Sequence, residues 1–267
     1  MSEQQPYILQ LKDIRISFTN AHNEKFDLLR GVNLDVEPGK ITALVGGNGT
    51  GKTTLFNIIS GFEKNYTGEV LFEGHNFNRI PAHHISLMGI GRLFQDGQLM
   101  GGLTLMENMK LASDDTTGEI PFSSLLFRNK WKQAEQKKEE QAREILVRIF
   151  GEGNKYLELL DQDGSAFSYG EQRILSLACM LMGGDRLLLL DEPTSGVNPH
   201  YIDKIEQIVR EMKEKEGLTV LLIEHNMHFV RKVADVCAYL DGGKILQVGD
   251  TIKVLDNENV RNSYMGL

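Results

Sequence analysis

The fold is decided by the stretch Gly46-Gly47-Asn48-Gly49-Thr50-Gly51-Lys52-Thr53-Thr54. It matches the pattern Gly-x4-Gly-Lys-Ser/Thr, in which the backbone N–H groups of a glycine-rich loop surround a polyphosphate. An apolar run at 41–45 precedes the stretch, and a largely apolar segment at 55–59 follows it. This order predicts a buried strand, a phosphate-binding loop and a helix whose N-terminus favours an anion. The stretch therefore predicts a nucleotide-binding site.

Within this loop, the glycines and two side chains have distinct expected roles. Glycine permits the positive φ angles that turn N–H groups toward a ligand, and we expect such turns at Gly46, Gly49 and Gly51. The Lys52 ammonium is expected to reach the β- and γ-phosphates, and the Thr53 hydroxyl to ligate Mg²⁺.

A second buried strand is predicted at 187–191, where four leucines are followed by Asp191 and then Glu192. An all-apolar run suits a parallel strand covered on both faces, and ligands bind at the carboxyl ends of such strands. Asp191 is then expected to help hold Mg²⁺ through water, and Glu192 to point at an attacking water. An Asp-Glu pair alone also fits a solvated loop, and the phosphate loop favours the catalytic interpretation.

Composition and charge narrow the class of protein. A chain of 267 residues with 41% hydrophobic content can bury a substantial core, either as one large domain or as a core plus a subdomain. Cys179 and Cys237 lie in apolar surroundings, which favours a reducing compartment over a disulfide framework. The start lacks a signal-peptide pattern, and no apolar run approaches the ~20 residues that cross a bilayer. A net charge of -8 without a long basic cluster argues against general nucleic-acid binding and leaves a local basic patch open.

The patterning along the chain predicts an α/β fold with an insertion. Strands are predicted at 7–16 and 32–36, and short apolar strands then alternate with helical stretches. That alternation is typical of a mostly parallel sheet with helices on its faces. Residues 113–140 are polar and lead into 131–150, where apolar residues recur at helical spacing, at Ala142, Ile145, Leu146, Ile149 and Phe150. This region predicts an inserted helical subdomain with a solvated, charged face.

Three further short stretches are informative when they are taken together with the phosphate loop and the acidic pair. They are Phe94-Gln95, Ser168-Tyr169-Gly170-Glu171-Gln172 and Ile223-Glu224-His225-Asn226. Each alone fits an ordinary structural role, as a polar loop, a helix cap or a histidine at a strand end. With the phosphate loop and the acidic pair, in this order along the chain, they resemble the motifs of the ATP-binding-cassette (ABC) ATPases. The resemblance extends from about residue 7 to the end.

The resemblance implies a fold and a division of the chain. The implied fold is α/β: a P-loop NTPase (RecA-like) core with a mostly parallel sheet, an N-terminal antiparallel β subdomain and an inserted α-helical subdomain. A single ABC ATPase domain would occupy 7–250, with its core at 7–91 and 178–250 and the helical subdomain at about 92–177. A C-terminal helical tail would follow at 251–267.

The resemblance also implies roles in ATP hydrolysis. Gln95 would sense Mg²⁺ and the γ-phosphate and couple to a membrane partner. Glu192 would be the general base, while Lys52 and Mg²⁺ stabilise the transferring charge and His225 orients the γ-phosphate. The implied metal ligands are Thr53, Gln95 and Asp191.

Adenine is expected to stack on an aromatic residue upstream of the phosphate loop. Phe18 fits the family position, but the chain carries a few extra residues around 20–25, which puts Phe26 in contention.

In the resembling family, two cassettes pack head to tail. ATP on one phosphate loop is then covered by the signature motif of the other, so Ser168, Gly170 and Gln172 would serve the nucleotide of a second copy or of a homologous ABC ATPase. A serine hydroxyl and backbone amides at a helix N-terminus suit this because they form a ready anion site.

Further stretches resemble the ATPases of branched-chain amino-acid importers: 57–62, 68–70, 90–95, 168–173, 196–199 and 264–266. This resemblance implies an ATP-hydrolysing subunit that powers import of branched-chain or other amino acids through separate membrane permease subunits, with a solute-binding protein as an indirect partner. Such a subunit is cytoplasmic and peripheral on the inner face of the cell membrane. The alternatives are the ATPase of a lipopolysaccharide-type exporter and a soluble non-transport ABC ATPase.

Several residues depart from the family pattern. Gly47 replaces a common proline, which makes the loop more flexible without removing an N–H that the phosphates require. Phe167 and Tyr169 replace the usual Leu and Gly of the signature motif. Cys179 stands where an arginine is common, and it fits a buried small apolar residue better than a redox switch.

Overall fold

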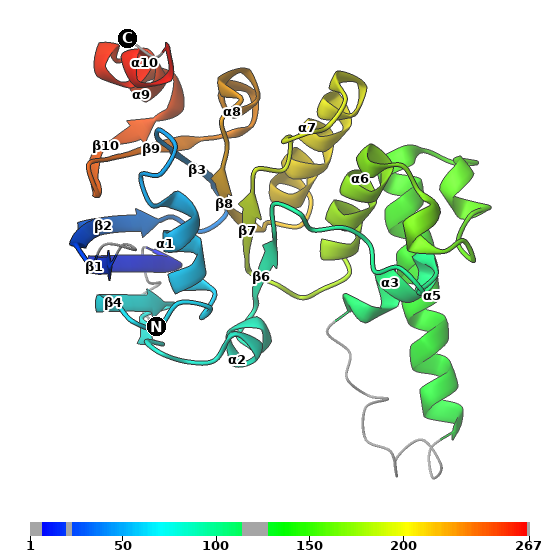
Figure 1. Cartoon of the computed structure of the whole chain (residues 1–267). Helices are drawn as coiled ribbons and strands as arrows, with labels where there is room; N and C mark the ends of the chain where they lie inside the picture. The colour runs from blue at the N-terminus through cyan, green and yellow to red at the C-terminus, as the bar shows by residue number, and fades with distance from the viewer. Residues whose placement is uncertain (1–6, 20–22, 114–127, 266–267) are drawn as a thin grey trace, which may run out of the picture. The chain divides into compact units, whose positions relative to one another are not determined.

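The computed structural model describes residues 7–19, 23–113 and 128–265 (Figure 1). The insertion expected around 20–25, the polar stretch within 113–140 and the ending 264–266 lie partly outside these residues. The chain divides into a first unit, Met1–Gln95, Asp185–Ser195 and Val209–Leu267, and a second unit, Asp96–Gly184 and Gly196–Ile208. The division expected from the sequence stays a prediction, with its helical part at about 92–177 overlapping the second unit.

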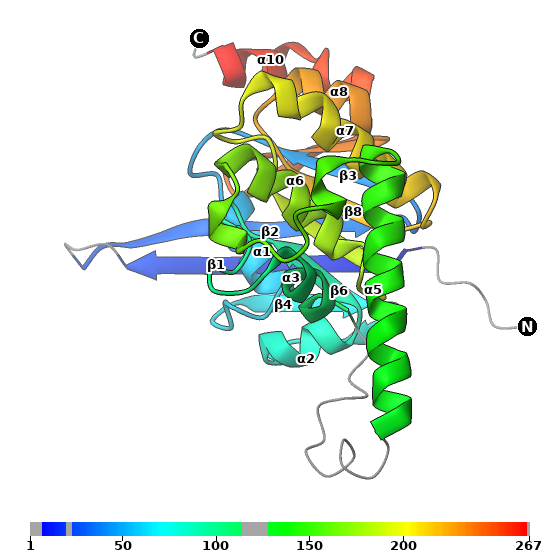
Figure 2. The ribbon, with the colours of Figure 1, turned by 90° about the vertical axis from the view of Figure 1, so that its right-hand side faces the viewer.

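A four-stranded antiparallel sheet forms the N-terminal part of the first unit, in the order β2-β1-β4-β5. Its strands are β1 (Leu9–Thr19), β2 (Lys25–Val36), β4 (Thr67–Phe72) and β5 (His75–Asn76). Figure 2 shows β1 and β2 side by side as a long hairpin, which pairs from Leu9 and Val36 to Thr19 and Lys25. The first part of β2, 25–30, mixes polar and apolar residues and is mostly exposed, so no apolar pattern marked it as a strand. Its pairing with β1 makes it one.

A six-stranded sheet follows, in the order β10-β9-β3-β8-β7-β6. Its pairs are parallel except for the antiparallel pair of β9 and β10. Every residue of β3, β7 and β8 is buried, as their apolar sequences predict for strands covered on both faces. The predicted mostly parallel sheet is therefore confirmed. The strands are β3 (Ile41–Val45), β6 (Ile90–Leu93), β7 (Leu187–Asp191), β8 (Thr219–Ile223), β9 (Val236–Asp241) and β10 (Lys244–Asp250).

Helix α1 (Lys52–Ile59) leaves the phosphate loop and enters the main core of the first unit. Its Leu55, Phe56, Ile58 and Ile59 side chains belong to one buried cluster that also contains residues of both sheets. That shared core fixes the start of the helix at the end of β3. The other helices of this unit are α2 (Ala82–Leu87), α8 (Met227–Val233), α9 (Thr251–Leu255) and α10 (Glu258–Met265).

The second unit is helical. Its elements are α3 (Leu105–Leu111), α5 (Arg128–Phe150), α6 (Tyr169–Met180) and the short 3₁₀ helices η1 (Lys155–Leu157) and η2 (Gly164–Ala166). Residues of α7 (Pro199–Glu214) belong to both units. The apolar face predicted for α5 is buried at Ala142, Ile145, Leu146 and Ile149. Within the described ranges, no helix has the length and apolar character needed to span a membrane.

Candidate nucleotide-binding site

The phosphate loop joins β3 to α1 and closes on itself. A Cβ atom at Gly46 would lie 2.2 Å from the carbonyl oxygen of Leu240, so only glycine fits there. Gly49 and Gly51 have φ angles of 74° and 102°, a region that glycine adopts without strain. The positive φ expected at Gly46 does not occur, so the close approach of Leu240 is what requires glycine there. Lys52 Nζ donates to two carbonyl oxygens of its own loop, each at 2.8 Å. The ammonium group thus lies inside the loop, at the position where phosphate oxygens can replace those carbonyl groups.

A hollow of about 350 Å³ opens at this loop. Burial lowers the pKa of the Lys52 ammonium, and the negative charges of Glu192 and Asp191 oppose that shift. Phe26 lines the hollow with 47% of its surface exposed, whereas Phe18 contacts the Phe26 ring at a centroid distance of 6.2 Å. Among the described residues, the lining comprises Phe26, Leu28, Asn48, Gly49, Gly51, Lys52, Thr53, Thr54, Glu192 and His225.

Glu192 lies at the end of β7 with both of its carboxylate oxygens in contact with other side chains. Gln95 Nε2 donates to Oε2 at 3.2 Å, and His225 Nε2 lies 3.2 Å from Oε1. The Glu192 backbone has a φ of 47°, a left-handed conformation that strains a residue other than glycine. The parallel order of β6, β7 and β8 therefore gathers Gln95, Glu192 and His225 from three successive strand ends.

Asp191 is held by an arginine that the sequence analysis did not single out. Arg92 on β6 lies 3.1 Å from Asp191 Oδ2, and the two side chains are only 5% and 2% exposed. Arg92 also donates to Asn57 Oδ1 at 2.8 Å and to Ser60 Oγ at 2.7 Å, so it ties β7 to the end of α1. Burial lowers the pKa of Arg92 and Asp191 raises it. The available sequence signal was an arginine inside the short strand Ile-Gly-Arg-Leu.

Glu224 was also missed, although it directly precedes His225. This carboxylate is 2% exposed and accepts hydrogen bonds from Thr194 N at 2.8 Å and Thr194 Oγ1 at 2.6 Å. It further accepts from the backbone N–H groups of His225 and Asn226, at 2.9 and 3.1 Å. Glu224 thus connects the loop after β7 to the loop after β8. We name Gln95, Asp191, Glu192, Glu224 and His225 the strand-end cluster.

The signature residues form a separate set at the N-terminus of α6, which we name the α6 cap: Ser168, Gly170, Glu171 and Gln172. Ser168 and Glu171 form a capping box, with Ser168 Oγ 2.7 Å from Glu171 Oε2. Burial would raise the pKa of Glu171, but hydrogen bonds from Lys155 and Ser168 outweigh it and lower the pKa to about 2. A Cβ at Gly170 would lie 2.5 Å from the Tyr201 ring, and the Gln172 side chain donates to the Phe167 carbonyl oxygen at 2.8 Å.

The candidate metal ligands Thr53, Gln95 and Asp191 offer a hydroxyl, an amide and a carboxylate oxygen. Hard cations such as Mg²⁺ prefer this donor set. No group of three or more His, Cys, Asp or Glu residues that could hold a metal ion occurs in the described part of the chain. Mg²⁺ is commonly bound by one or two protein oxygens together with phosphate oxygens and water, a mode that this donor set suits.

Comparison with known proteins agrees with this geometry. The family described as ABC transporter matches residues 29–195. The branched-chain amino acid transport ATP-binding proteins BraF of Pseudomonas aeruginosa and LivG of Escherichia coli are each 32% identical over 238 residues, covering 89% of this chain and 91% of the relative. A probable LivG of Archaeoglobus fulgidus is 35% identical over 256 residues, 95% of this chain and 96% of the relative.

Solved structures of ATP-binding cassettes from ABC transporters are also similar to this chain. The ADP conformation of an ATP-binding cassette of an ABC transporter is 31% identical, with a TM-score of 0.78, and the match covers 97% of this chain and 99% of that one. A nucleotide-free cassette from an ABC transporter is also 31% identical, with a TM-score of 0.76 over the same shares of the two chains. The chain belongs to the ABC transporter family, as one of its ATP-hydrolysing, ATP-binding cassettes.

Proposed function

We propose that this ATPase powers the import of branched-chain or related amino acids through separate membrane permease subunits. The observation that carries the proposed hydrolysis is the meeting of Gln95, Glu192 and His225 beside the Lys52 loop. The names of the relatives, which are 32% to 35% identical over most of this chain, support the proposed class of solute.

Nucleotide binding begins with the phosphates in the loop. The Lys52 ammonium exchanges its two loop carbonyl partners, each at 2.8 Å, for β- and γ-phosphate oxygens. The N–H groups at the start of α1 add the positive end of the helix dipole. Adenine stacks on Phe26 rather than Phe18, because Phe26 lines the hollow and presents an exposed ring.

Glu192 is the proposed general base. It takes a proton from the water that attacks the γ-phosphorus, while the Gln95 and His225 contacts hold its two oxygens in a fixed direction. His225 then also contacts the γ-phosphate as the hollow fills. Thr53, Gln95 and Asp191 are the proposed ligands of Mg²⁺, which when bound neutralises charge on the β- and γ-phosphates.

The α6 cap is proposed to act on the nucleotide of a second cassette, either another copy of this chain or a homologous ATPase. Ser168 Oγ and the N–H groups at the start of α6 suit a γ-phosphate, because a helix N-terminus attracts anions. In this arrangement two ATP molecules lie between two cassettes. The assembly is peripheral on the inner face of the membrane, bound to permease subunits and served by a solute-binding protein.

Glu192→Gln tests the proposed hydrolysis. Loss of the base should lower ATP turnover by about 100- to 10,000-fold while ATP binding persists, since general-base catalysis contributes on this scale. Glu152→Gln, on an exposed turn of the second unit, is the matched control and should leave turnover unchanged. Turnover within a few-fold of the unchanged protein would remove Glu192 as the base.

Uptake of labelled leucine and isoleucine by cells that lack the chain tests the class of solute separately. Uptake should fall and should return with the unchanged chain but not with Glu192→Gln. Unchanged uptake in the deficient cells, combined with normal ATPase activity of the purified protein, would refute the solute and leave the ATPase assignment standing.

A further inference from the structure

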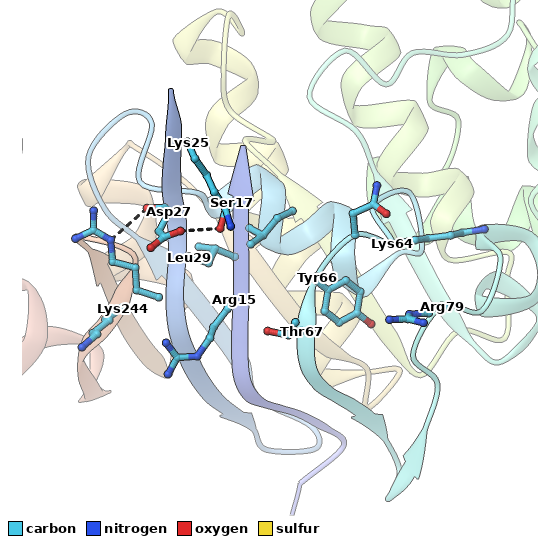
Figure 3. A pocket seen from close by; sticks show the side chains of 13 residues that line it. Arg15, Ser17, Lys25, Asp27, Leu29, Lys64, Tyr66, Thr67, Arg79 and Lys244 are labelled. Carbon is cyan, nitrogen blue, oxygen red and sulfur yellow. Dashed lines mark hydrogen bonds between the residues drawn. The ribbon is translucent and has the colours of Figure 1, made fainter. Parts of the chain in front are cut away.

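The first unit has a second hollow, which is larger than the one at the phosphate loop. It has a volume of about 900 Å³ and shares no described lining residue with the nucleotide hollow (Figure 3). Strands β1 and β2, the segment 64–67, Arg79 and the start of β10 form its walls. We name it the basic hollow after its cationic residues, Arg15, Lys25, Arg30, Lys64, Arg79 and Lys244.

The basic hollow is positively charged, whereas the chain as a whole is negatively charged. Its lining holds the six cations and a single carboxylate, that of Asp27, whereas the whole chain has a net charge of -8. A concave surface lined by one sign of charge focuses the electric field and concentrates ions of the opposite sign. The basic hollow is therefore the local basic patch that the overall composition left open.

Folding alone does not account for these cations. Arg15 and Arg30 are direct cross-strand partners on β1 and β2, an arrangement in which like charges are destabilising. Arg15 pairs with Asp13 at 2.7 Å, but both side chains are more than half exposed, so the pair stabilises the fold little. The N–H of Arg30 donates to the Gly243 carbonyl oxygen at 2.8 Å, which brings Lys244 of β10 beside the same position. Three strands thus place cations next to one another.

The three lysines of the basic hollow have no side-chain partner in the described part of the chain. The side-chain amines of Lys25, Lys64 and Lys244 make no hydrogen bond or ion pair with any residue in the described ranges. The carboxylate of Asp27 already accepts a hydrogen bond from Ser17 Oγ at 2.6 Å. The positive charge of the hollow is therefore largely uncompensated within the described chain.

The shape of the hollow indicates the chemistry of its ligand. Figure 3 shows Lys244 on one side of the β1–β2 hairpin and Lys64 and Arg79 on the other, so a single phosphate ion cannot contact all of them. The volume suits a small molecule the size of a nucleotide. The lining also offers hydrogen-bonding groups between the cations, on Ser17, Asn65, Tyr66 and Thr67.

We propose that the basic hollow is a second anion-binding site, which takes a soluble small molecule carrying several phosphate or carboxylate groups. A single side chain, that of Leu29, lies between the basic hollow and the phosphate loop. Leu29 lines the basic hollow, and a Cβ at Gly51 of the phosphate loop would lie 2.6 Å from Leu29 Cδ2. Occupancy of the basic hollow is thus positioned to influence the phosphate loop, although binding itself requires no ATP hydrolysis.

Binding of inositol hexakisphosphate tests the proposal. Calorimetry at low ionic strength, with the phosphate loop filled by saturating ADP, should detect one saturable site whose affinity falls as salt is added. The double variant Lys25→Gln/Lys244→Gln removes two charges whose amines have no described partner, and it should weaken binding by at least about tenfold. Its thermal midpoint should match that of the unchanged protein, which separates lost binding from lost folding.

The matched control is Lys132→Gln/Lys137→Gln, which removes the same charge from exposed positions on α5. It should retain the affinity of the unchanged protein within about twofold, since neither lysine lines the basic hollow. Equal weakening by both double variants would reduce the effect to net charge and overturn the site. Absence of saturable binding would overturn it as well.

Phosphate headgroups of lipids carry the same kind of charge as the proposed soluble ligand, so they are the alternative occupant of the basic hollow. Sedimentation with phosphatidylcholine vesicles, with and without phosphatidylglycerol, should show no anionic-lipid binding that depends on Lys25 and Lys244. Vesicle binding that needs these lysines, without binding of the soluble probe, would overturn the soluble ligand in favour of a headgroup. Neither result depends on ATP turnover, so failure here leaves the proposed transport function untouched.

Discussion

The strand-end cluster and the α6 cap both hold carboxylates, and they do so in opposite ways. In the cap, Ser168 and Glu171 are three positions apart and close a capping box at 2.7 Å. In the cluster, Gln95 reaches Glu192 across 97 positions of sequence at 3.2 Å, and the Glu192 backbone is strained. A local, satisfied network stabilises a helix, whereas a distant, strained one leaves a carboxylate available for chemistry. The two regions should therefore respond differently to substitution.

The largest effect is expected from Arg92→Met, beside the cluster. Removing one partner of a buried ion pair leaves the Asp191 charge uncompensated, so the free energy of unfolding should fall by about 3–5 kcal/mol. Urea denaturation measures this loss. Arg186→Met is the control, because the Arg186 side chain is 51% exposed and its pair with Glu73 is worth little. Equal losses in the two variants would show that the Arg92 pair is not a special support of the cluster.

The next largest effect is expected from Lys52→Ala. Phosphate oxygens lose a buried, charged donor, so ATP binding should weaken by about 1.5–3 kcal/mol. Titration with a fluorescent ATP analogue measures the affinity. Lys40→Ala, which breaks only a surface pair with Glu37, should bind ATP normally. Tight binding by Lys52→Ala would contradict the phosphate-loop assignment.

In the cap, Gly170→Ala should act on stability rather than on nucleotide affinity. The added methyl group would lie 2.5 Å from the Tyr201 ring, and overpacking of this kind costs about 1–3 kcal/mol. Thermal unfolding measures the loss. Gly101→Ala is the matched control in the same unit, since its Cβ would meet Ser165 at an ordinary 3.5 Å. A stable Gly170→Ala protein would show that the ring moves aside easily.

Ser168→Ala removes the capping hydroxyl and should lower the unfolding free energy by about 1 kcal/mol. Ser168→Thr preserves a hydroxyl at the cap and should restore most of the stability. Denaturation midpoints of the isolated chain, without nucleotide, measure both. If threonine fails to restore stability, the hydroxyl is not what stabilises the start of α6.

The smallest effect concerns pH. The pKa of Glu171 falls from 4.5 to about 2 on folding, so ionised Glu171 stabilises the folded chain fully above pH 4.5. That contribution is lost as the pH falls toward 2. The stability advantage of the unchanged protein over Glu171→Gln should therefore shrink between about pH 5 and pH 3 in denaturant titrations. A constant difference across that range would show that the charge of Glu171 does not support the cap.

Local patterns in the sequence were sufficient to predict much of the fold. The loop 46–54, the leucine run before Asp191 and the helical spacing on α5 each encode their structure within one short segment. The first part of β2 was not predicted, because its mixed polar and apolar residues are mostly exposed and form a strand only when β1 lies beside them. The expected roles of Ser168, Gly170 and Gln172 stay predictions, since they require a second cassette.

The sequence by itself determined the phosphate loop, the buried parallel strands and the acidic pair at 191–192, because glycine conformation and apolar burial are properties of neighbouring residues. Only the tertiary structure decided which residues support them. Arg92 meets Asp191, Glu224 joins two loops, and Phe26 rather than Phe18 lines the nucleotide hollow. The basic hollow likewise joins cations from distant segments. Such contacts depend on strand order and register, which bring together side chains that no local pattern connects.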